Sequence, residues 1–449
     1  MKTISLFVAA FATIFLMVSC TNALIESSTI STDQIRKVEL LTKSLEEKLS
    51  KGVIQSDVEN YLIYRENISF EEIDEITKYP IKDDIYIFIV NLKDGRWFFF
   101  SGDYSTSPII AKGKGNGYHL KNEISRHDQN WFYSIRNMII KNRTDNSEQT
   151  KRNREEWIRA NRKAELTAHN NRSEEPDTME VEILYLLDTL KYENYPNLTS
   201  TNWDQSVPWN HAMPKYGIND HCLAGCTVIG LAQLLYYTHY HFGFPNEIYE
   251  SASCDDYYTA GPPYNFNFSN LTTSSWNQMV LSFSDDPLCY YDPYMPALCA
   301  LIAQRSNTTY GIDTSAPSTS YDYSFGSTTV SNTVSAMTSF FLYGASPIPY
   351  TKANVINEIQ NDRPVLTSGT VDPYDTTGHA FLIDGYYWIK LQEREQIWDT
   401  NGHLLEENTY ISETFYWDIN TGNPQHHIQT TEYSYYPQNR ITFIGWSQN

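Results

Sequence analysis

Positive charge is scarce in this sequence. Its 449 residues include 33 lysines and arginines against 54 aspartates and glutamates, which gives a formal net charge of −21 at pH 7. Such a chain repels the phosphate backbone of DNA and RNA, so we expect no nucleic-acid partner. A glycine-rich phosphate loop of the Walker or dinucleotide type is also missing, as is a His-Glu-x-x-His zinc motif. These absences argue against nucleotide-dependent chemistry, and we expect no cofactor.

The apolar run near the N-terminus is too short for a membrane-spanning helix. It extends over residues 4–18 after Lys2 and ends in small residues, the pattern of an export signal. Met17-Val18-Ser19-Cys20 resembles a lipobox, in which the cysteine receives a lipid. We therefore expect residues 1–20 to direct export, with the periplasm, an outer-membrane lipoprotein and secretion as alternatives. Membrane contact would then occur only through a lipid on Cys20.

Cysteine is rare as well, with six in the whole chain. An odd number remains once Cys20 is set aside, so an exported protein would keep one free thiol even if the others paired. The count alone neither identifies that thiol nor gives the pairing. The remaining cysteines are Cys222, Cys226, Cys254, Cys289 and Cys299.

Residues 21–190 are predicted to form a small α+β domain without an obvious catalytic constellation. Two β-rich runs around Asp94-Gly95 predict a hairpin, because this dipeptide favours the tight turn between antiparallel strands. Apolar residues spaced by three or four predict helices elsewhere. The expected elements are helices Asp33–Leu49, Trp131–Asn170 and Glu180–Leu190, and strands Ile85–Val90, Arg96–Phe100 and Ser107–Ile110.

A domain boundary is expected near residues 191–200, so that residues 191–449 form a second domain with helices early and strands late. No internal repeat is evident. A turn at Asp399–Gly402 predicts another hairpin, between strands on either side of it. The other expected elements are helices Met279–Ser306 and Asn354–Gln360, a Gly/Ser loop at Tyr321–Thr328, and strands from Gly378, at Phe415–Ile419 and at Ile441–Trp446.

Cys226 opens a predicted helix in the second domain. The apolar residues Val228, Leu231, Ala232 and Leu235 follow at helical spacing, which indicates one buried face. Unpaired backbone N–H groups and the helix dipole stabilise a thiolate at this position, so the pKa of Cys226 should fall. A nucleophilic cysteine needs such a setting. The alternative is a structural cysteine that opens a core helix.

His379 follows Cys226 by 379 − 226 = 153 residues and leads into an apolar strand. A cysteine peptidase needs a histidine to accept and return the thiol proton, and the order Cys then His fits that chemistry. The alternative for His379 is an ordinary edge or loop histidine.

Four sequence blocks resemble the streptopain family of bacterial cysteine peptidases, which belongs to the papain clan. The resemblance implies a papain-like domain with a helical lobe and an antiparallel β lobe, preceded by an inhibitory prodomain over residues 21–190. It also implies protein or peptide substrates. The blocks are Trp203-Asp-Gln205-x-x-Pro208-Trp209-Asn210, Gly225-Cys226, Arg363-Pro364-Val365 and Gly378-His379-Ala-Phe-x-Ile-Asp-Gly385-Tyr386.

The same resemblance implies the site residues. Cys226 is the expected nucleophile, His379 the general base and acid, and Gln205 a donor to the oxyanion beside the Cys226 N–H. The family has Asn-Trp-Gly-Trp-Gly after the histidine strand, where this chain has Asn420-Thr421-Gly422. Asn420 is therefore expected to orient His379. Asp418 is a rival, because a strand places both side chains on one face.

Two other readings compete with an exported cysteine endopeptidase made as a zymogen. A papain-fold lipoprotein that only binds its partner is one, because the family's tryptophans near Asn420 are missing. A zinc site is the other, although the cysteine pair in it has no second matching pair. Its conceivable ligands are His221, Cys222, Cys226, His239 and His241.

Overall fold

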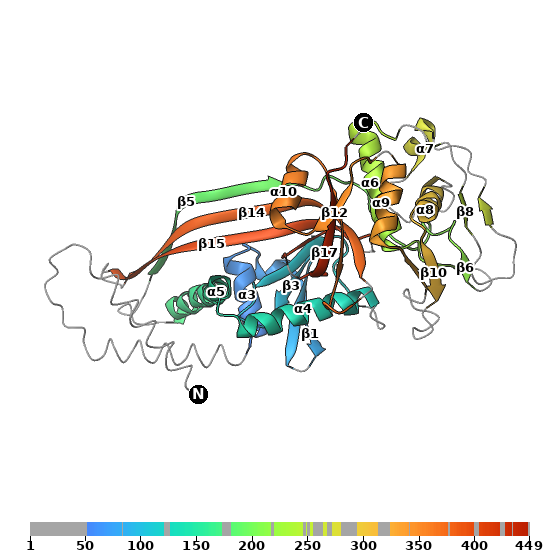
Figure 1. Ribbon diagram of the computed structural model, residues 1–449. Helices are drawn as coiled ribbons and strands as arrows, with labels where there is room; N and C mark the ends of the chain where they lie inside the picture. The colour runs from blue at the N-terminus through green and yellow to red at the C-terminus, as the bar shows by residue number, and fades with distance from the viewer. Residues whose placement is uncertain are drawn as a thin grey trace. The chain divides into compact units, whose positions relative to one another are not determined.

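An antiparallel sheet of eleven strands contains strands from both halves of the chain (Figure 1). The first half is the expected prodomain, residues 21–190, and the second half is the expected peptidase domain, residues 191–449. Its strand order is β1-β2-β3-β4-β16-β15-β14-β13-β17-β12, and β5 also pairs with β14. The strands are β1 Ile73–Lys82, β2 Ile85–Leu92, β3 Arg96–Ser101, β4 Ile109–Lys114, β5 Val181–Tyr195, β12 Ser346–Pro349, β13 Val365–Thr370, β14 His379–Trp398, β15 Leu404–Asn420, β16 His427–Thr430 and β17 Gln438–Ile444.

This structure is a computed structural model. The predicted export signal and the predicted helix Asp33–Leu49 lie outside the residues that it describes. Those residues are 52–82, 84–120, 126–172, 181–216, 220–245, 248, 252–254, 264–266, 272–279, 294–312, 324–340, 342–375, 378–398, 404–422, 427–432 and 434–447.

The predicted hairpin around Asp94-Gly95 is confirmed. Strands β2 and β3 pair from Ile87 with Ser101 to Asn91 with Trp97. Gly95 has a φ of +83°, which glycine adopts without strain, and a Cβ there would lie 1.9 Å from the Gly115 carbonyl oxygen. The predicted third strand is also present as β4, which begins at Ile109.

The single helix predicted over Trp131–Asn170 is wrong, because two helices cover this stretch. Helix α4 spans Arg126–Thr144 and α5 spans Glu148–Arg172. Between them the Asp145 carboxylate accepts hydrogen bonds from the backbone N–H and the hydroxyl of Ser147, at 2.9 and 2.8 Å. Such local bonds compete with helical ones and end the first helix. Two shorter elements precede these helices, α3 Gln55–Tyr64 and the 3₁₀ turn η1 Phe70–Glu72.

The predicted helix Glu180–Leu190 is also wrong, since this stretch belongs to strand β5. β5 pairs with β14 from Val181 opposite Trp398 to Tyr195 opposite Tyr386. Apolar runs such as Ile183–Leu187 are compatible with a strand or a helix. Here the segment forms a strand because it pairs with the long edge of β14. β5, β14 and β15 lie side by side (Figure 1).

Strand β5 should stabilise the peptidase part of the chain. A fragment that starts at Pro196 lacks β5 and leaves one edge of β14 without its hydrogen-bond partner. We expect the midpoint of its thermal unfolding to lie about 5–10 °C below that of a fragment starting at Val181. Differential scanning calorimetry of both fragments checks this. Equal midpoints would contradict a stabilising role.

The second half begins with short strands and helices that cover one face of the sheet. Helix α6, Cys226–Phe242, confirms the helix predicted to open at Cys226. The helix predicted over Met279–Ser306 is described as α8, Tyr294–Arg305, and the loop predicted at Tyr321–Thr328 contains strand β11. The elements here also include β6 Lys215–Tyr216, β7 Asp220–His221, β8 Ala252–Cys254, β9 Tyr264–Phe266, α7 Thr273–Gln278, β10 Thr309–Ile312, β11 Ser324–Ser327, α9 Val330–Ser339 and α10 Lys352–Gln360.

Two hydrophobic cores lie on opposite faces of the sheet. One packs α6 and α8 against Leu366 and Leu382. The other joins Trp97, Phe99 and Trp131 of the first half to side chains of the second half, Phe381 among them. Phe381 and Leu382 are neighbours on β14 and therefore point to opposite faces. The hairpin predicted around Asp399–Gly402 is confirmed by the pairing of β14 with β15, and these strands are longer than expected. None of the described helices is long and apolar enough to cross a membrane.

Candidate active site

Cys226 lies at the first position of α6, where the chain turns sharply into the helix. Gly225 precedes it with a φ of +98°, and a Cβ at Gly225 would lie 3.0 Å from the Gly326 carbonyl oxygen. Only glycine meets both demands. Cys226 is a partly buried free thiol. Two residues upstream, the Ala224 N–H donates to the Gln205 carbonyl at 2.8 Å, so Gln205 lies beside the same turn.

The backbone N–H of Ala380, the residue that follows His379, lies near enough to the Cys226 sulfur to lower the pKa of the thiol. The start of α6 thus meets the start of β14. The fold therefore brings the backbones of Cys226 and His379 together, although the two residues are 379 − 226 = 153 positions apart in the sequence. This juxtaposition is the central observation at the site.

The ring of His379 is buried, with 6% of its surface exposed. Its Nε2–H donates to the backbone carbonyl of Thr421 at 2.9 Å. Four aromatic rings surround it, including that of Phe381 with its centroid at 6.2 Å. The ring of His127 meets the His379 ring edge to face with centroids 4.9 Å apart, and the rings of Tyr436 and Tyr435 lie at 5.1 and 6.1 Å.

The electrostatics of this form differ from the predicted thiolate and imidazolium. Burial raises the pKa of the Cys226 thiol, and this outweighs the lowering by hydrogen bonds from Ala380 and Thr227. Burial, and then the neighbouring His127, lower the pKa of His379 to about 3. The predicted fall in the pKa of Cys226 is therefore wrong for this form. In this form the favoured states are a neutral Cys226 thiol and a neutral His379 imidazole.

His127, on the first turn of α4, is a residue that the sequence did not single out. Its two ring nitrogens lie 3.2 Å from the Tyr435 hydroxyl and 3.3 Å from the Tyr436 hydroxyl. Burial lowers the pKa of His127 to about 3. One histidine in a polar helix gives no sequence signal. Only the fold shows that it faces His379.

Acid should loosen the contact between α4 and the site. Because burial lowers the pKa values of His127 and His379 to about 3, their contribution to stability is complete above pH 6.5 and is lost as pH falls towards 3. The loss approaches about 1.4 kcal/mol per pH unit for each ring. Between pH 7 and pH 5, we expect faster hydrogen exchange of the α4 amides in the full-length chain. His127→Phe should respond about half as strongly, and an unchanged response would contradict the role of His127.

Asn420 does not occupy the position predicted for it. Among the described residues its Nδ2 donates to the Thr201 carbonyl at 2.7 Å and lies 3.3 Å from both the Thr199 hydroxyl and His427 Nε2. It therefore makes no hydrogen bond to His379 within this part of the chain. Asn420 pairs with Leu382, on the sheet face that packs against α6, whereas His379 shares the opposite face with Phe381. The Thr421 carbonyl holds the ring instead.

Asp418, the rival to Asn420, belongs to a buried acidic pair with Asp384. Burial raises the pKa of Asp384 to about 7. Burial and then the charge of Asp384 raise the pKa of Asp418 to about 7. Both carboxyls stabilise the fold below their unfolded pKa values, and this contribution is lost as pH rises through 7. That trend opposes the histidine effect, so a local measurement on α4 is the proper test above.

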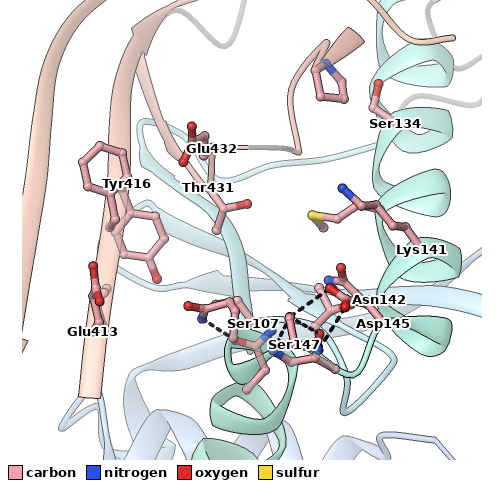
Figure 2. Close-up of a pocket in the computed structure, with 18 of the residues that line it drawn as sticks. Ser107, Ser134, Lys141, Asn142, Asp145, Ser147, Glu413, Tyr416, Thr431 and Glu432 are labelled. Atoms are coloured by element: carbon pink, nitrogen blue, oxygen red, sulfur yellow. Dashed lines mark hydrogen bonds between the residues drawn. The ribbon is translucent and has the colours of Figure 1, made fainter. Parts of the chain in front are cut away.

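A polar cavity of about 430 Å³ lies between α4, α5 and β15, and its lining does not include the predicted site residues. Figure 2 shows Ser134 and Lys141 on a helix at one side and Glu413 and Tyr416 on a strand at the other. The cavity thus separates the first half of the chain from the second. A gap of this kind, lined by many polar side chains, suits two parts that can come apart. In the described part of the chain, no three His, Cys, Asp or Glu side chains are grouped so as to hold a metal ion.

Comparison with known proteins finds a family model that matches part of the second half. Residues 203–408 match the model of the Peptidase C10 family, which is the streptopain family. A fragment of Prevotella intermedia prointerpain A is 15% identical, covers 84% of this chain and 99% of its own, and superposes with a TM-score of 0.50. The active wild-type interpain A cysteine protease is 18% identical, covers 59% and 100%, and has a TM-score of 0.38. No match was found among curated proteins. The family resemblance and the α+β fold are confirmed.

Proposed function

We infer that this chain is a cysteine-type endopeptidase and that its Peptidase C10 domain performs the reaction with Cys226 and His379. The observation that carries this assignment is the nearness of the Cys226 thiol, at the start of α6, to the backbone of Ala380, which directly follows His379 at the start of β14. Cys226 is also the first residue of α6, where the helix dipole favours a thiolate once water returns to the site.

The reaction follows from these positions. The Cys226 thiolate attacks the scissile carbonyl carbon, and the C–N bond of the tetrahedral adduct breaks as His379 gives its proton to the leaving amine. Water then hydrolyses the thioester, with His379 as the base. The Cys226 N–H and the Gln205 amide are the proposed donors to the oxyanion. The Thr421 carbonyl fixes the imidazole ring through Nε2–H.

Active-site labelling tests the assignment. A peptidyl epoxide should modify one thiol in the processed protein, and mass spectrometry of the digested product should place the label on Cys226. A label on another cysteine would show that this other cysteine, and not Cys226, is the nucleophile. Absence of both labelling and peptide cleavage would favour the papain-fold binding lipoprotein. That alternative draws on Thr421-Gly422 replacing the tryptophan-rich segment of the family.

We also propose that the first half of the chain keeps the enzyme latent. It contacts the second half through the hydrophobic core that the two share, and also by pairing of β4 with β16, by the packing of His127 on His379, and by the approach of Arg159 to Glu393 at 3.4 Å. The covered pair is neutral, as described above, and a neutral thiol is a poor nucleophile. Removal of the inhibitory segment before about residue 190 would rehydrate the pair.

Export and a lipid on Cys20 complete the proposal. Their support is the sequence of residues 1–20 alone. Substrates would then be proteins or peptides outside the cytoplasm. Cell fractionation tests the anchor, because wild type should be recovered with membranes and a Cys20→Ser variant should not.

A further inference from the structure

The segment that leads from β5 to α6 crosses between the catalytic cysteine helix and the turn that holds His379. Thr201 in this segment donates through its hydroxyl to the Gln233 side-chain oxygen on α6 at 3.0 Å. The Thr201 carbonyl in turn accepts from Asn420 at 2.7 Å. Gln233 and Asn420 are both fully buried. One residue thus connects α6 with the end of β15.

Asn420 in turn shapes the turn that follows it. Its side-chain oxygen accepts from the Gly422 N–H at 3.4 Å. Gly422 has a φ of +62°, and a Cβ there would lie 3.3 Å from Ile229 on α6. The residue between them, Thr421, supplies the carbonyl that accepts from His379. Moving the Asn420 amide therefore moves the acceptor of the catalytic histidine.

Two further polar groups, the Thr199 hydroxyl and the His427 ring, contact the Asn420 amide. The Thr199 hydroxyl donates to Asp384 Oδ2, and the Thr199 N–H donates to the same oxygen at 3.2 Å. The oxygen of that hydroxyl lies 3.3 Å from Asn420 Nδ2. His427 Nε2 also lies 3.3 Å from Asn420, and His427 Nδ1 lies 3.7 Å from Asp384 Oδ2. Asp384 is fully buried and its Oδ1 has no hydrogen-bond partner among the described residues.

We propose that Thr199, Thr201, Asp384 and His427 form a clamp on the buried Asn420 that positions the Thr421 carbonyl and thereby the ring of His379. These are positioning residues, because they act through Thr421 and lie on the opposite sheet face from the His379 ring. The proposal rests on the function assigned above. It explains how this chain holds its histidine with Asn420-Thr421-Gly422 where the family has tryptophans.

The tautomer of His379 reports whether the clamp holds the ring, and it can be measured without any catalytic turnover. In the full-length chain labelled with ¹³C-histidine, the wild type should show His379 with its proton on Nε2, as donation to the Thr421 carbonyl requires. A His379→Gln sample identifies the signal. Thr199→Val keeps the size of the side chain but removes the hydroxyl, so the Nε2–H population of His379 should fall. The same change is expected in Asn420→Ala.

Thr442→Val is the matched control, since Thr442 is also a buried threonine whose hydroxyl donates to a backbone carbonyl, that of Ile348 at 3.4 Å. It should leave the tautomer unchanged. An unaltered tautomer in both Thr199→Val and Asn420→Ala would overturn the clamp. A change of equal size in Thr442→Val would also overturn it, because any buried threonine would then have the same effect.

Kinetics of the processed enzyme give the second readout. Asn420→Ala should lower kcat about 100-fold and Thr199→Val about tenfold, with KM nearly constant, because a misplaced general base slows chemistry more than binding. Equal losses through KM would overturn a positioning role. If wild type itself cleaves no peptide, the proposed function fails, while the tautomer result still decides whether the clamp holds His379.

Discussion

Replacing Cys226 with alanine should reduce kcat/KM of the processed enzyme for a peptide by at least about 10⁴-fold, to the background of hydrolysis without a nucleophile. The reason is that Cys226 is the residue that opens α6, beside the backbone of Ala380, and alanine has no thiol to attack the substrate. The measurement is turnover of a fluorogenic peptide by wild type and variant, each processed by an added serine protease that is inactivated before the assay.

Cys299→Ala is the matched control for this experiment. Cys299 is fully buried in α8, within the core that packs against α6. Its replacement removes a sulfur from the core but leaves the site intact, so kcat/KM should stay within a few-fold of wild type. Retention of more than a tenth of the activity in Cys226→Ala would contradict the assignment of the nucleophile.

Separation of the first half of the chain should raise activity about 100-fold. A latent form more stable than the open form by about 2.7 kcal/mol leaves one molecule in a hundred open, and removal of the cover frees the rest. Comparison of initial rates for the intact chain and the processed enzyme measures this ratio. Equal rates would show that the contacts of β4, His127 and Arg159 do not inhibit.

A single substitution at His127 should give part of this effect without any cut. His127→Ala in the intact chain removes a partly buried ring that packs against His379, and we expect labelling of Cys226 by iodoacetamide to rise about tenfold. His119→Ala is the matched control, because His119 lies exposed in the same half of the chain, with Nε2 3.0 Å from the Asn116 carbonyl oxygen. An equal rise in both variants would contradict a specific role of His127.

Some parts of this fold are visible in the sequence because local chemistry determines them. Gly225 before a run of helical period predicts α6, and Asp94-Gly95 between β-rich runs predicts the β2–β3 hairpin. Cys226 and His379 could be named for the same reason, since each lies where an element begins. The predicted boundary near residues 191–200 stays a prediction. So do the roles of Gln205 and of Asn420 in the active enzyme.

Other parts depend on partners that are distant in sequence. β5 looks helical on its own and becomes a strand because β14 offers it a long edge, from Tyr386 to Trp398. The Thr421 carbonyl holds His379, and a backbone acceptor leaves no mark in a sequence. His127 became visible only when α4 was placed against Tyr435 and Tyr436. Such features require the tertiary structure, however strong the local signals.

The pairing of β4 with β16 is short, with Gly113, Lys112 and Ala111 opposite Ile428, Gln429 and Thr430. A contact of this size suffices while both strands belong to one chain, because covalent connection gives them an effective concentration in the millimolar range for a short tether. After a cut, the same surfaces would have to meet from solution. Dilution would then favour dissociation, so a cut should shift the balance from the latent towards the open form.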